Sequence, residues 1–374
     1  MKTNPIIAPI LALSFVFTCL SCDQRVGKKS DYPIRPVPFN QVRVTDQFWA
    51  PRIQRNAEVT IPIAFQQSEE TGRIKNFKVA AGLEEGGFCS LYPFDDSDVF
   101  KIMEGASYSL QTYPDPQLEA YLDTLVYYIS LAQKEDGYLY TNRTILGDSA
   151  HPWAGKERWE LVHELSHELY NLGHLFEAAV AHYQATGKRE FLDVAIKAAD
   201  LVDESFGDTT YVNYPGHQEI EIGLIKLYRV TGDERYLELA RFFLEARENG
   251  SEYNQAHKKV TEQELAVGHA VRAMYMYAAM TDIAALTGDR IYERATERLW
   301  EDVVYTKMYI TGGIGARRGH EGFGEPYELP NLEAYCETCA AIAFVLWNHR
   351  MFLLKGDARY YDVIERTLYN GLLS

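Results

Sequence analysis

Apolar residues recur at three- and four-residue steps through most of the chain beyond residue 38. This period is typical of α-helices that bury one face. It is clearest between residues 169 and 183, at Leu169, Leu172, Phe176, Ala179, Val180 and Tyr183. His167, Asn171 and His174 fall on another side of the same predicted helix. The pattern therefore predicts a helix that packs on one side and lines a polar space on the other. Strand-like alternation is scarce elsewhere in the chain.

Four predicted helices end in variants of one short connector. In each connector a glycine is followed, four or five residues later, by Phe or Tyr; the glycines are Gly187, Gly232, Gly288 and Gly356. Glycine adopts the left-handed conformation that ends a helix, and the aromatic residue would begin the apolar face of the next helix. Each connector therefore predicts an αα-hairpin. With two further hairpins between residues 48 and 133, the chain predicts an all-α ring of about six hairpins.

The spacing of the glycines indicates where insertions lie. Successive connectors are 45, 56 and 68 residues apart, so the repeat is degenerate. The connectors themselves are similar, and the extra residues must therefore lie at the opposite ends of the hairpins. We expect the functional residues to be at that end.

Reactive side chains stand near the starts of these helices. His167, His217 and His269 precede three of the helical stretches, and Glu337 with Cys339 begins the fourth. One such histidine is usually an ordinary hydrogen-bonded residue. Three in the same layout favour a common site, because parallel inner helices would bring their first residues to one rim. The sequence therefore predicts an active site at that rim.

Residues 163–167 match the H-E-x-x-H pattern of zinc peptidases. On a helix, His163 and His167 would share one face. The metzincin continuation is missing, since Tyr170 stands where that pattern requires glycine. A peptidase is therefore the less favoured hypothesis.

A glycine-rich segment, residues 311–331, leads into the last helical stretch. Long loops on a rigid scaffold commonly carry working residues. Glu321 on this loop could serve as a general acid if it is partly desolvated; the alternative is a solvated loop carboxylate. Glu337 and Cys339 offer an oxygen and a sulfur, and Zn²⁺ accepts both.

The first 22 residues have the features of an export signal. Lys2 supplies positive charge and residues 6–20 form an apolar run too short to span a bilayer comfortably. Cys22 and the polar residues after it predict lipid attachment; simple cleavage and periplasmic release is the alternative. We expect a linker over residues 23–37, a domain over residues 38–374, and a bacterial envelope location, periplasmic or as an outer-membrane lipoprotein.

Charge and cysteine content exclude two classes of protein. The net charge of −16 argues against binding a phosphate backbone, so nucleic acid is not an expected partner. Only Cys89, Cys336 and Cys339 follow the signal, an odd number with no framework spacing, and a disulfide scaffold is unsupported. We expect contact with a membrane only through the lipid anchor.

Six segments, taken in order, resemble glycoside hydrolase family 127, the β-L-arabinofuranosidase family. They are residues 46–52, 96–101, 135–138, 167–175, 215–219 and 311–340. The resemblance implies an (α/α)6 barrel and a glycosidase acting on L-arabinofuranosyl-containing oligo- or polysaccharides. It implies a retaining mechanism with a cysteine nucleophile held on Zn²⁺.

The resemblance also assigns roles to residues of this chain. Glu321 resembles the acid/base, and Glu337 and Cys339 resemble two zinc ligands. The three helix-start histidines resemble sugar-contacting residues, and Gln66, or its neighbour Gln67, is a weaker candidate for the same role. The imidazoles would hold ring hydroxyls in place.

The family's other two zinc ligands are adjacent cysteines downstream, one of them the nucleophile, and no cysteine follows Cys339 here. We therefore expect a barrel incomplete at its C-terminal end, with no nucleophile in this chain and impaired cleavage. Cys336 could in principle stand in, but a packing role fits it better. Hydrolysis of an aryl β-L-arabinofuranoside well above a Glu321→Gln control would contradict this expectation.

Two alternatives stay open. One is another (α/α)6 carbohydrate enzyme, an unsaturated glycuronyl hydrolase or a polysaccharide lyase, which would work without zinc. The other is a catalytically inactive sugar-binding lipoprotein.

Overall fold

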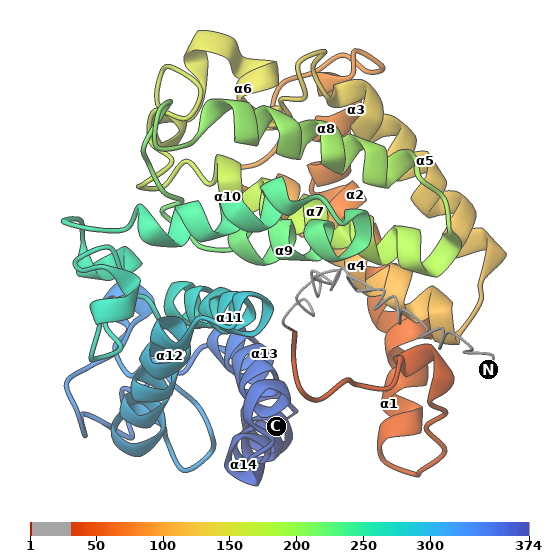
Figure 1. The fold of residues 1–374 in the computed structure, drawn as a ribbon. Coiled ribbons are helices and arrows are strands. Elements are labelled where there is room, and N and C mark those ends of the chain that lie inside the picture. The colour runs from red at the N-terminus through yellow and green to blue at the C-terminus, as the bar shows by residue number, and fades with distance from the viewer. Residues whose placement is uncertain (2–30, 374) are drawn as a thin grey trace.

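The computed structural model describes Met1 and residues 31–373. Helices dominate this part of the chain, which contains isolated β-bridges and no strand. The predicted all-α class is therefore confirmed. The α-helices (Figure 1) are α1 (Trp49–Arg55), α2 (Ile61–Glu70), α3 (Arg73–Ala80), α4 (Asp96–Thr112), α5 (Pro116–Ala132), α6 (Thr141–Leu146), α7 (Glu168–Thr186), α8 (Glu190–Ser205), α9 (Ile220–Thr231), α10 (Glu234–Glu245), α11 (Ala270–Thr287), α12 (Arg290–Asp302), α13 (Thr338–Lys355) and α14 (Ala358–Arg366).

Successive helices pair as antiparallel hairpins. Helices α4, α7, α9, α11 and α13 are each followed by a partner, α5, α8, α10, α12 and α14, that packs against them. The first members also pack on one another in chain order, α4 on α7, α7 on α9, α9 on α11 and α11 on α13. In Figure 1, α7 to α10 cross the centre of the molecule and α11 to α14 stand at the lower left. The described residues thus form the predicted ring of hairpins, with one parallel set of inner helices.

All four predicted connectors end their helices in the same way. Gly187, Gly232, Gly288 and Gly356 are C-caps with φ of 74°, 75°, 71° and 70°. A residue with a Cβ is strained there, and glycine is not. The aromatic residues that follow are buried and begin the apolar face of the outer helices, as predicted; they are Phe191, Tyr236, Tyr292 and Tyr360.

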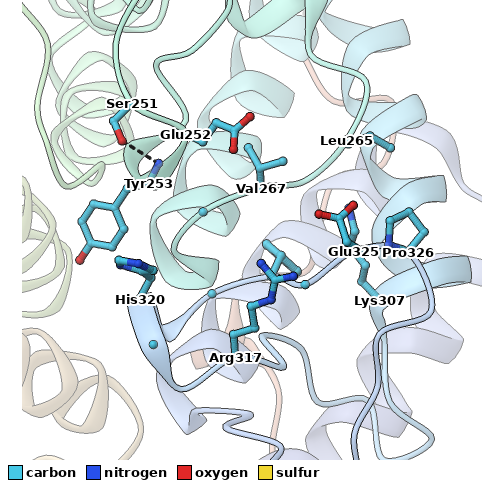
Figure 2. Close-up of a pocket in the computed structure, with 15 residues that line it drawn as sticks. Ser251, Glu252, Tyr253, Leu265, Val267, Lys307, Arg317, His320, Glu325 and Pro326 are labelled. Carbon is cyan, nitrogen blue, oxygen red and sulfur yellow. Dashed lines mark hydrogen bonds between the residues drawn. The ribbon is translucent and has the colours of Figure 1, made fainter.

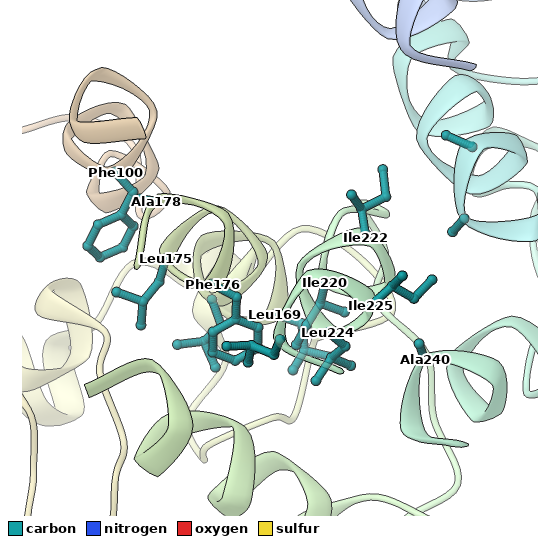
Figure 3. Close-up of a cluster of buried hydrophobic side chains, with 14 of the residues drawn as sticks. Phe100, Leu169, Leu175, Phe176, Ala178, Ile220, Ile222, Leu224, Ile225 and Ala240 are labelled. Atoms are coloured by element: carbon teal, nitrogen blue, oxygen red, sulfur yellow. The ribbon is translucent and has the colours of Figure 1, made fainter. Parts of the chain in front are cut away.

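The inner helices are buried almost all round. Helix α11 exposes little besides Tyr275 and its C-terminal turn, and α7 is buried along most of its length. The core between α4, α7, α9 and α10 is filled by aliphatic and aromatic side chains (Figure 3), among them Phe100, Leu175, Phe176 and Leu224. A helix that is apolar on several faces is the expected inner member of such a ring.

Two glycines let α7 and α9 approach closely. A Cβ built on Gly173 would lie 2.7 Å from the backbone of Glu219 and Ile220, and one on Gly223 would lie 2.6 Å from the Gly173 carbonyl oxygen. Neither glycine has a left-handed φ, so both are required by packing and not by conformation. The contact sets the position of residues 217–220, which carry His217, relative to α7.

The H-E-x-x-H segment is not a helix, so the prediction that His163 and His167 share one helical face is wrong. Residues 163–165 form turns, and helix α7 begins only at Glu168. His167 stands before it with φ of 58°. A left-handed residue breaks the hydrogen-bond ladder, and His163 therefore cannot share a helical face with His167.

The predicted signal peptide, Cys22 and most of the predicted linker lie outside the described residues. The first linker residues that the structure describes make specific contacts. The Tyr32 hydroxyl donates to Asp282 at 2.6 Å, and Asp31 pairs with Arg229 at 3.0 Å. Asp282 in turn accepts from Arg350 of α13 at 2.7 Å, so this segment joins α9, α11 and α13. Among the described helices, none combines the length and apolar character that a membrane crossing would need.

We predict that Gly173→Ala lowers the free energy of unfolding by roughly 1–3 kcal/mol, because the added methyl must push α7 and α9 apart. Gly105→Ala on α4 is the matched control. No atom lies within 4 Å of a Cβ at Gly105, and helix propensity favours alanine there by about 0.5–1 kcal/mol. Urea unfolding followed by circular dichroism measures both, and equal effects of the two substitutions would contradict the role of the close contact.

Candidate active site

Three imidazoles meet at the rim where the inner helices begin. The ring centroids of His167 and His217 lie 5.7 Å apart, and those of His217 and His269 also lie 5.7 Å apart. The three residues stand before α7, α9 and α11, and are therefore brought together by the parallel arrangement of these helices. Their predicted role in holding a sugar stays a prediction, but the geometry gives them one common space.

Glu321 points into the same space from the glycine-rich loop. Its carboxylate accepts a hydrogen bond from Nε2 of His269 at 3.0 Å and another from the Tyr335 hydroxyl at 3.1 Å. His320 and Glu321 both have positive φ, 70° and 50°. The backbone bridge between His269 and Gly322 anchors the loop beside α11. Glu321 is thus a held carboxylate with about half of its side chain open to solvent.

Glu337 and Cys339 complete the group at the start of α13. Glu337 is the N-cap residue, and its Oε2 is buried without a hydrogen-bond partner. His269, Glu321 and Glu337 each offer one ligand atom within 4.8 Å of the others. Partial burial and the neighbouring Glu337 carboxylate raise the pKa of the Cys339 thiol to about 11. The metal-free thiol is therefore protonated at neutral pH.

Hydrogen-bond partners assign the tautomers of the three histidines. Nδ1 of His167 contacts the Leu165 carbonyl, and Nδ1 of His217 contacts the Gln218 carbonyl at 2.8 Å. Each Nδ1 must carry the proton that it donates, so Nε2 of both rings is an acceptor. In His269 the proton is on the other ring nitrogen, Nε2. Its Nδ1 faces the Arg272 amide, and its Nε2 donates to Glu321. The site therefore offers two acceptors and one held donor.

Burial keeps all three imidazoles neutral. Desolvation, followed by the charge of Arg272, lowers the pKa of His167 to about 3 and that of His269 to about 4. Desolvation and Arg272 also hold the pKa of His217 well below its usual range. Neutral imidazoles suit hydrogen bonding to uncharged hydroxyl groups.

Arg272 was not predicted, although it stands in the first turn of α11. Its guanidinium is buried, donates to the Gly216 carbonyl and lies 4.5 Å from the centroid of the Tyr253 ring. Its position three residues after His269 was the available signal. Tyr335 and Tyr170 were also missed; the Tyr170 ring lies 4.4 Å from that of His217. Nothing in the residue types alone separates these tyrosines from the many that pack the core.

Behind the histidines lies a buried charged cluster, made of Glu104, His174, Glu177, Glu219 and Lys226. Lys226 pairs with Glu104 at 2.9 Å and also contacts Glu177. Burial and the nearby Glu177 raise the pKa of Glu219 well above its usual value, so Glu219 is protonated. Burial by itself would raise the pKa of Glu177, but the charge of Lys226 outweighs this effect and lowers that pKa to about 2. His174 lies between Glu219, at 3.4 Å, and the Tyr170 ring. The cluster supports Tyr170 and the segment that carries His217.

The remaining candidates lie elsewhere. Gln66 is exposed on α2, where its amide donates to Glu70 at 2.7 Å, and no contact within the described residues joins it to the histidines. Gln67 lines a shallow cleft that also contains Lys101, whose ammonium lies 4.9 Å from the Tyr170 ring centroid. Cys336 has a φ of 43° and packs against Gly313.

Comparison with known proteins identifies relatives. Residues 41–374 match the model of the β-L-arabinofuranosidase GH127 catalytic domain. A non-reducing end β-L-arabinofuranosidase from Bifidobacterium longum subsp. longum is 35% identical over 378 aligned residues, which cover 89% of this chain and 57% of the relative.

Solved structures agree with this match. A GH127 β-arabinofuranosidase is 57% identical, with a TM-score of 0.89 over 91% of this chain and 55% of its own. A GH127 β-L-arabinofuranosidase from Geobacillus stearothermophilus T6 is 43% identical, with a TM-score of 0.83 over 88% of this chain and 55% of its own. The chain thus spans about half the length of these relatives. A sugar epimerase from a ruminal bacterium, at 11% identity and a TM-score of 0.50, shares the fold alone.

We predict that neutral His167 makes the protein acid-sensitive. The unfolded chain binds a proton near pH 6.5, whereas folded His167 does so only near 3. The free energy of unfolding that depends on a neutral His167 is therefore fully present above pH 6.5 and is lost as the pH falls toward 3. His167→Asn removes it and tolerates the left-handed φ.

The melting temperature of His167→Asn should fall less between pH 7 and pH 4.5 than that of the unchanged protein. His163→Asn, at a more exposed imidazole on the preceding turn, is the control and should follow the unchanged protein. An identical fall in all three proteins would contradict the burial argument.

Proposed function

This chain belongs to the GH127 catalytic-domain family of β-L-arabinofuranosidases, and from that premise we propose that it functions in the hydrolysis of L-arabinofuranosyl-containing oligo- or polysaccharides. The observation that carries the proposal is the contact between Glu321 and His269 at the rim shared by three neutral imidazoles. A proton donor and a set of hydroxyl-binding groups are thereby directed to one space.

The histidines bind the sugar and Glu321 transfers the proton. Nε2 of His167 and of His217 accept hydrogen bonds from ring hydroxyls of the sugar, which holds its anomeric carbon near Glu321. Glu321, when protonated, gives its proton to the leaving oxygen as the glycosidic bond breaks. In the first half of a retaining reaction the anomeric carbon bonds to a nucleophile as the leaving oxygen departs, and the residues assigned here do not supply that nucleophile. In the second half the same carboxylate takes a proton from the water that displaces the nucleophile. Tyr335 and His269 keep the carboxylate in place during both steps.

Zn²⁺ is part of the proposal, and two residues present here fit it. Glu337 has a buried oxygen without a partner, and Cys339 is the sulfur donor beside it. Carboxylate and thiolate are both zinc ligands, and these two residues would hold the ion together with further donors. The chemistry that bound zinc supplies is to keep a cysteine sulfur ionised at neutral pH.

We also propose an envelope location with lipid attachment at Cys22. Support comes from the sequence of the first 22 residues, and the substrate class agrees with it because glycans outside the cell reach such a protein directly.

Sugar binding tests the proposal most directly. Titration calorimetry with methyl β-L-arabinofuranoside should show binding to the 374-residue chain. His217→Ala should weaken it at least tenfold, about 1.4 kcal/mol, because the ring acceptor is lost. Glu321→Gln should bind within about threefold of the unchanged protein, because the imidazoles and not Glu321 hold the sugar. The two proteins should hydrolyse an aryl β-L-arabinofuranoside at similarly low rates, because we assign no nucleophile in this chain. Unchanged affinity in His217→Ala would refute the binding role.

Metal binding tests the zinc donors separately. Cobalt added to the metal-free protein should give a sulfur-to-cobalt charge-transfer absorption, and Cys339→Ser should abolish it. Glu337→Gln should weaken zinc affinity in a chelator competition by at least about tenfold. Cys89→Ser, at an exposed cysteine away from the site, is the matched control and should leave both readings unchanged. A charge-transfer band that survives Cys339→Ser would rule out this thiol as a ligand.

A further inference from the structure

The chain enters the fold at one end of the ring, through a strap formed by residues 31–34. Asp31 pairs with Arg229 of α9 at 3.0 Å. The amide of Ile34 donates to the carbonyl of Leu353 in α13 at 3.2 Å. Both partners lie in the last turn of their helices, whereas the histidines stand before the first turns. The strap is therefore held at the end of the ring where the glycine connectors lie, which we call the connector end.

The connector end and the histidine rim are separated by the length of the inner helices. Helices α7, α11 and α13 contain 19, 18 and 18 residues. At about 1.5 Å of rise per residue they are roughly 27 Å long. Longer segments join the helices at the rim; these rim segments are residues 81–95, 133–167, 206–219, 246–269 and 303–337. The strap thus lies roughly one helix length from the rim.

The two ends differ in charge. The turns at the connector end contain six Lys or Arg and six Asp or Glu; they are residues 113–115, 186–190, 231–235, 287–290 and 355–359. The rim segments contain ten Lys or Arg and twenty Asp or Glu. Figure 2 shows parts of two rim segments, with Glu252 on one and Glu325 on the other. A membrane surface with anionic lipids attracts basic groups and repels acidic ones, so it accepts the connector end more readily than the rim.

The position of Cys22 adds a limit on distance. Cys22 precedes Asp31 by nine positions. Nine residues reach at most about 30 Å when fully extended. If the rim touched the membrane, the strap would be held roughly 27 Å above the surface, and the chain back to Cys22 would have to be almost fully extended. Such extension costs conformational entropy, whereas an orientation with the connector end toward the membrane does not require it.

We propose that the connector end faces the membrane and that the histidine rim opens away from it. The proposal rests on the lipid attachment at Cys22 proposed above and adds which face of the protein meets the lipid surface, here a bilayer that contains anionic lipids. The strap determines where the chain leaves the fold, the distance to Cys22 limits the height of that point, and charge favours the same face. A polysaccharide then reaches the rim without contact with the membrane.

Energy transfer to a labelled bilayer measures this orientation. The lipidated chain is bound to vesicles of phosphatidylcholine and phosphatidylglycerol that contain an acceptor-labelled lipid, and one donor dye is placed on an introduced cysteine. Arg290→Cys puts the dye at the connector end and Leu332→Cys puts it at the rim; both side chains are exposed. Cys89→Ser, Cys336→Ser and Cys339→Ser keep the dye off the other thiols. Transfer from position 290 should be at least about twofold larger, because position 332 lies roughly 27 Å farther from the lipid.

Release of the strap tests its part in the orientation. Asp31→Ala, Tyr32→Ala and Ile34→Pro together remove the ion pair and both hydrogen bonds of the strap. The chain is next held at Phe39, by a ring contact with α4. The distance that the chain can span from Cys22 then rises about twofold, and the difference between the two labels should fall by at least about half. Val37→Ala, at an exposed residue just after the strap, is the control and should keep the full difference.

The outcomes separate this proposal from those made above. Equal transfer from the two labels, or greater transfer from position 332, overturns the orientation while lipid attachment and the glycosidase proposal stand. If the chain fails to bind the vesicles, or if Cys22→Ser binds them equally well, lipid attachment fails and the orientation with it. Should the triple variant melt well below Val37→Ala, the comparison of the two labels with the strap intact decides alone.

Discussion

The site depends on one constraint, that the inner helices all begin at the same rim of the ring. Helices α7, α9, α11 and α13 each end at a glycine in the left-handed conformation, and the chain then turns into an outer helix that returns it to the rim. Residues roughly fifty positions apart are therefore neighbours in space. Without this repeated turn, His167, His217 and His269 would have no common surroundings.

Close packing fixes the positions of the inner helices relative to one another. Gly173 and Gly223 allow α7 and α9 to touch through backbone atoms, and Glu219 lies directly in that contact. In the charged cluster behind it, the ammonium of Lys226 pairs with Glu104 and contacts Glu177, and Glu219 is protonated. A buried network of this kind is costly unless its members are paired, and it therefore favours one relative position of the helices.

Burial also determines the chemistry of the rim. Arg272 and desolvation keep the imidazoles neutral, and backbone carbonyls decide which ring nitrogen carries the proton. A side-chain hydrogen bond from His269 to Glu321 joins this histidine group to the glycine-rich loop. The same environment that makes the histidines good partners for hydroxyl groups thus also holds the acid/base carboxylate beside them.

The sequence by itself determined the helices, their glycine stops and the aromatic residue that starts each outer helix, because these depend on local conformation and on the period of apolar side chains. It also placed the histidines, Glu337 and Cys339 at helix starts. The tertiary structure decided the rest. Because His167 has a left-handed φ, the H-E-x-x-H segment is not the helix that its pattern predicts. Packing between helices places Arg272 and Tyr335 at the rim. It leaves Gln66 exposed to solvent. These outcomes depend on contacts between residues distant in the chain, and no pattern of neighbouring residues records them.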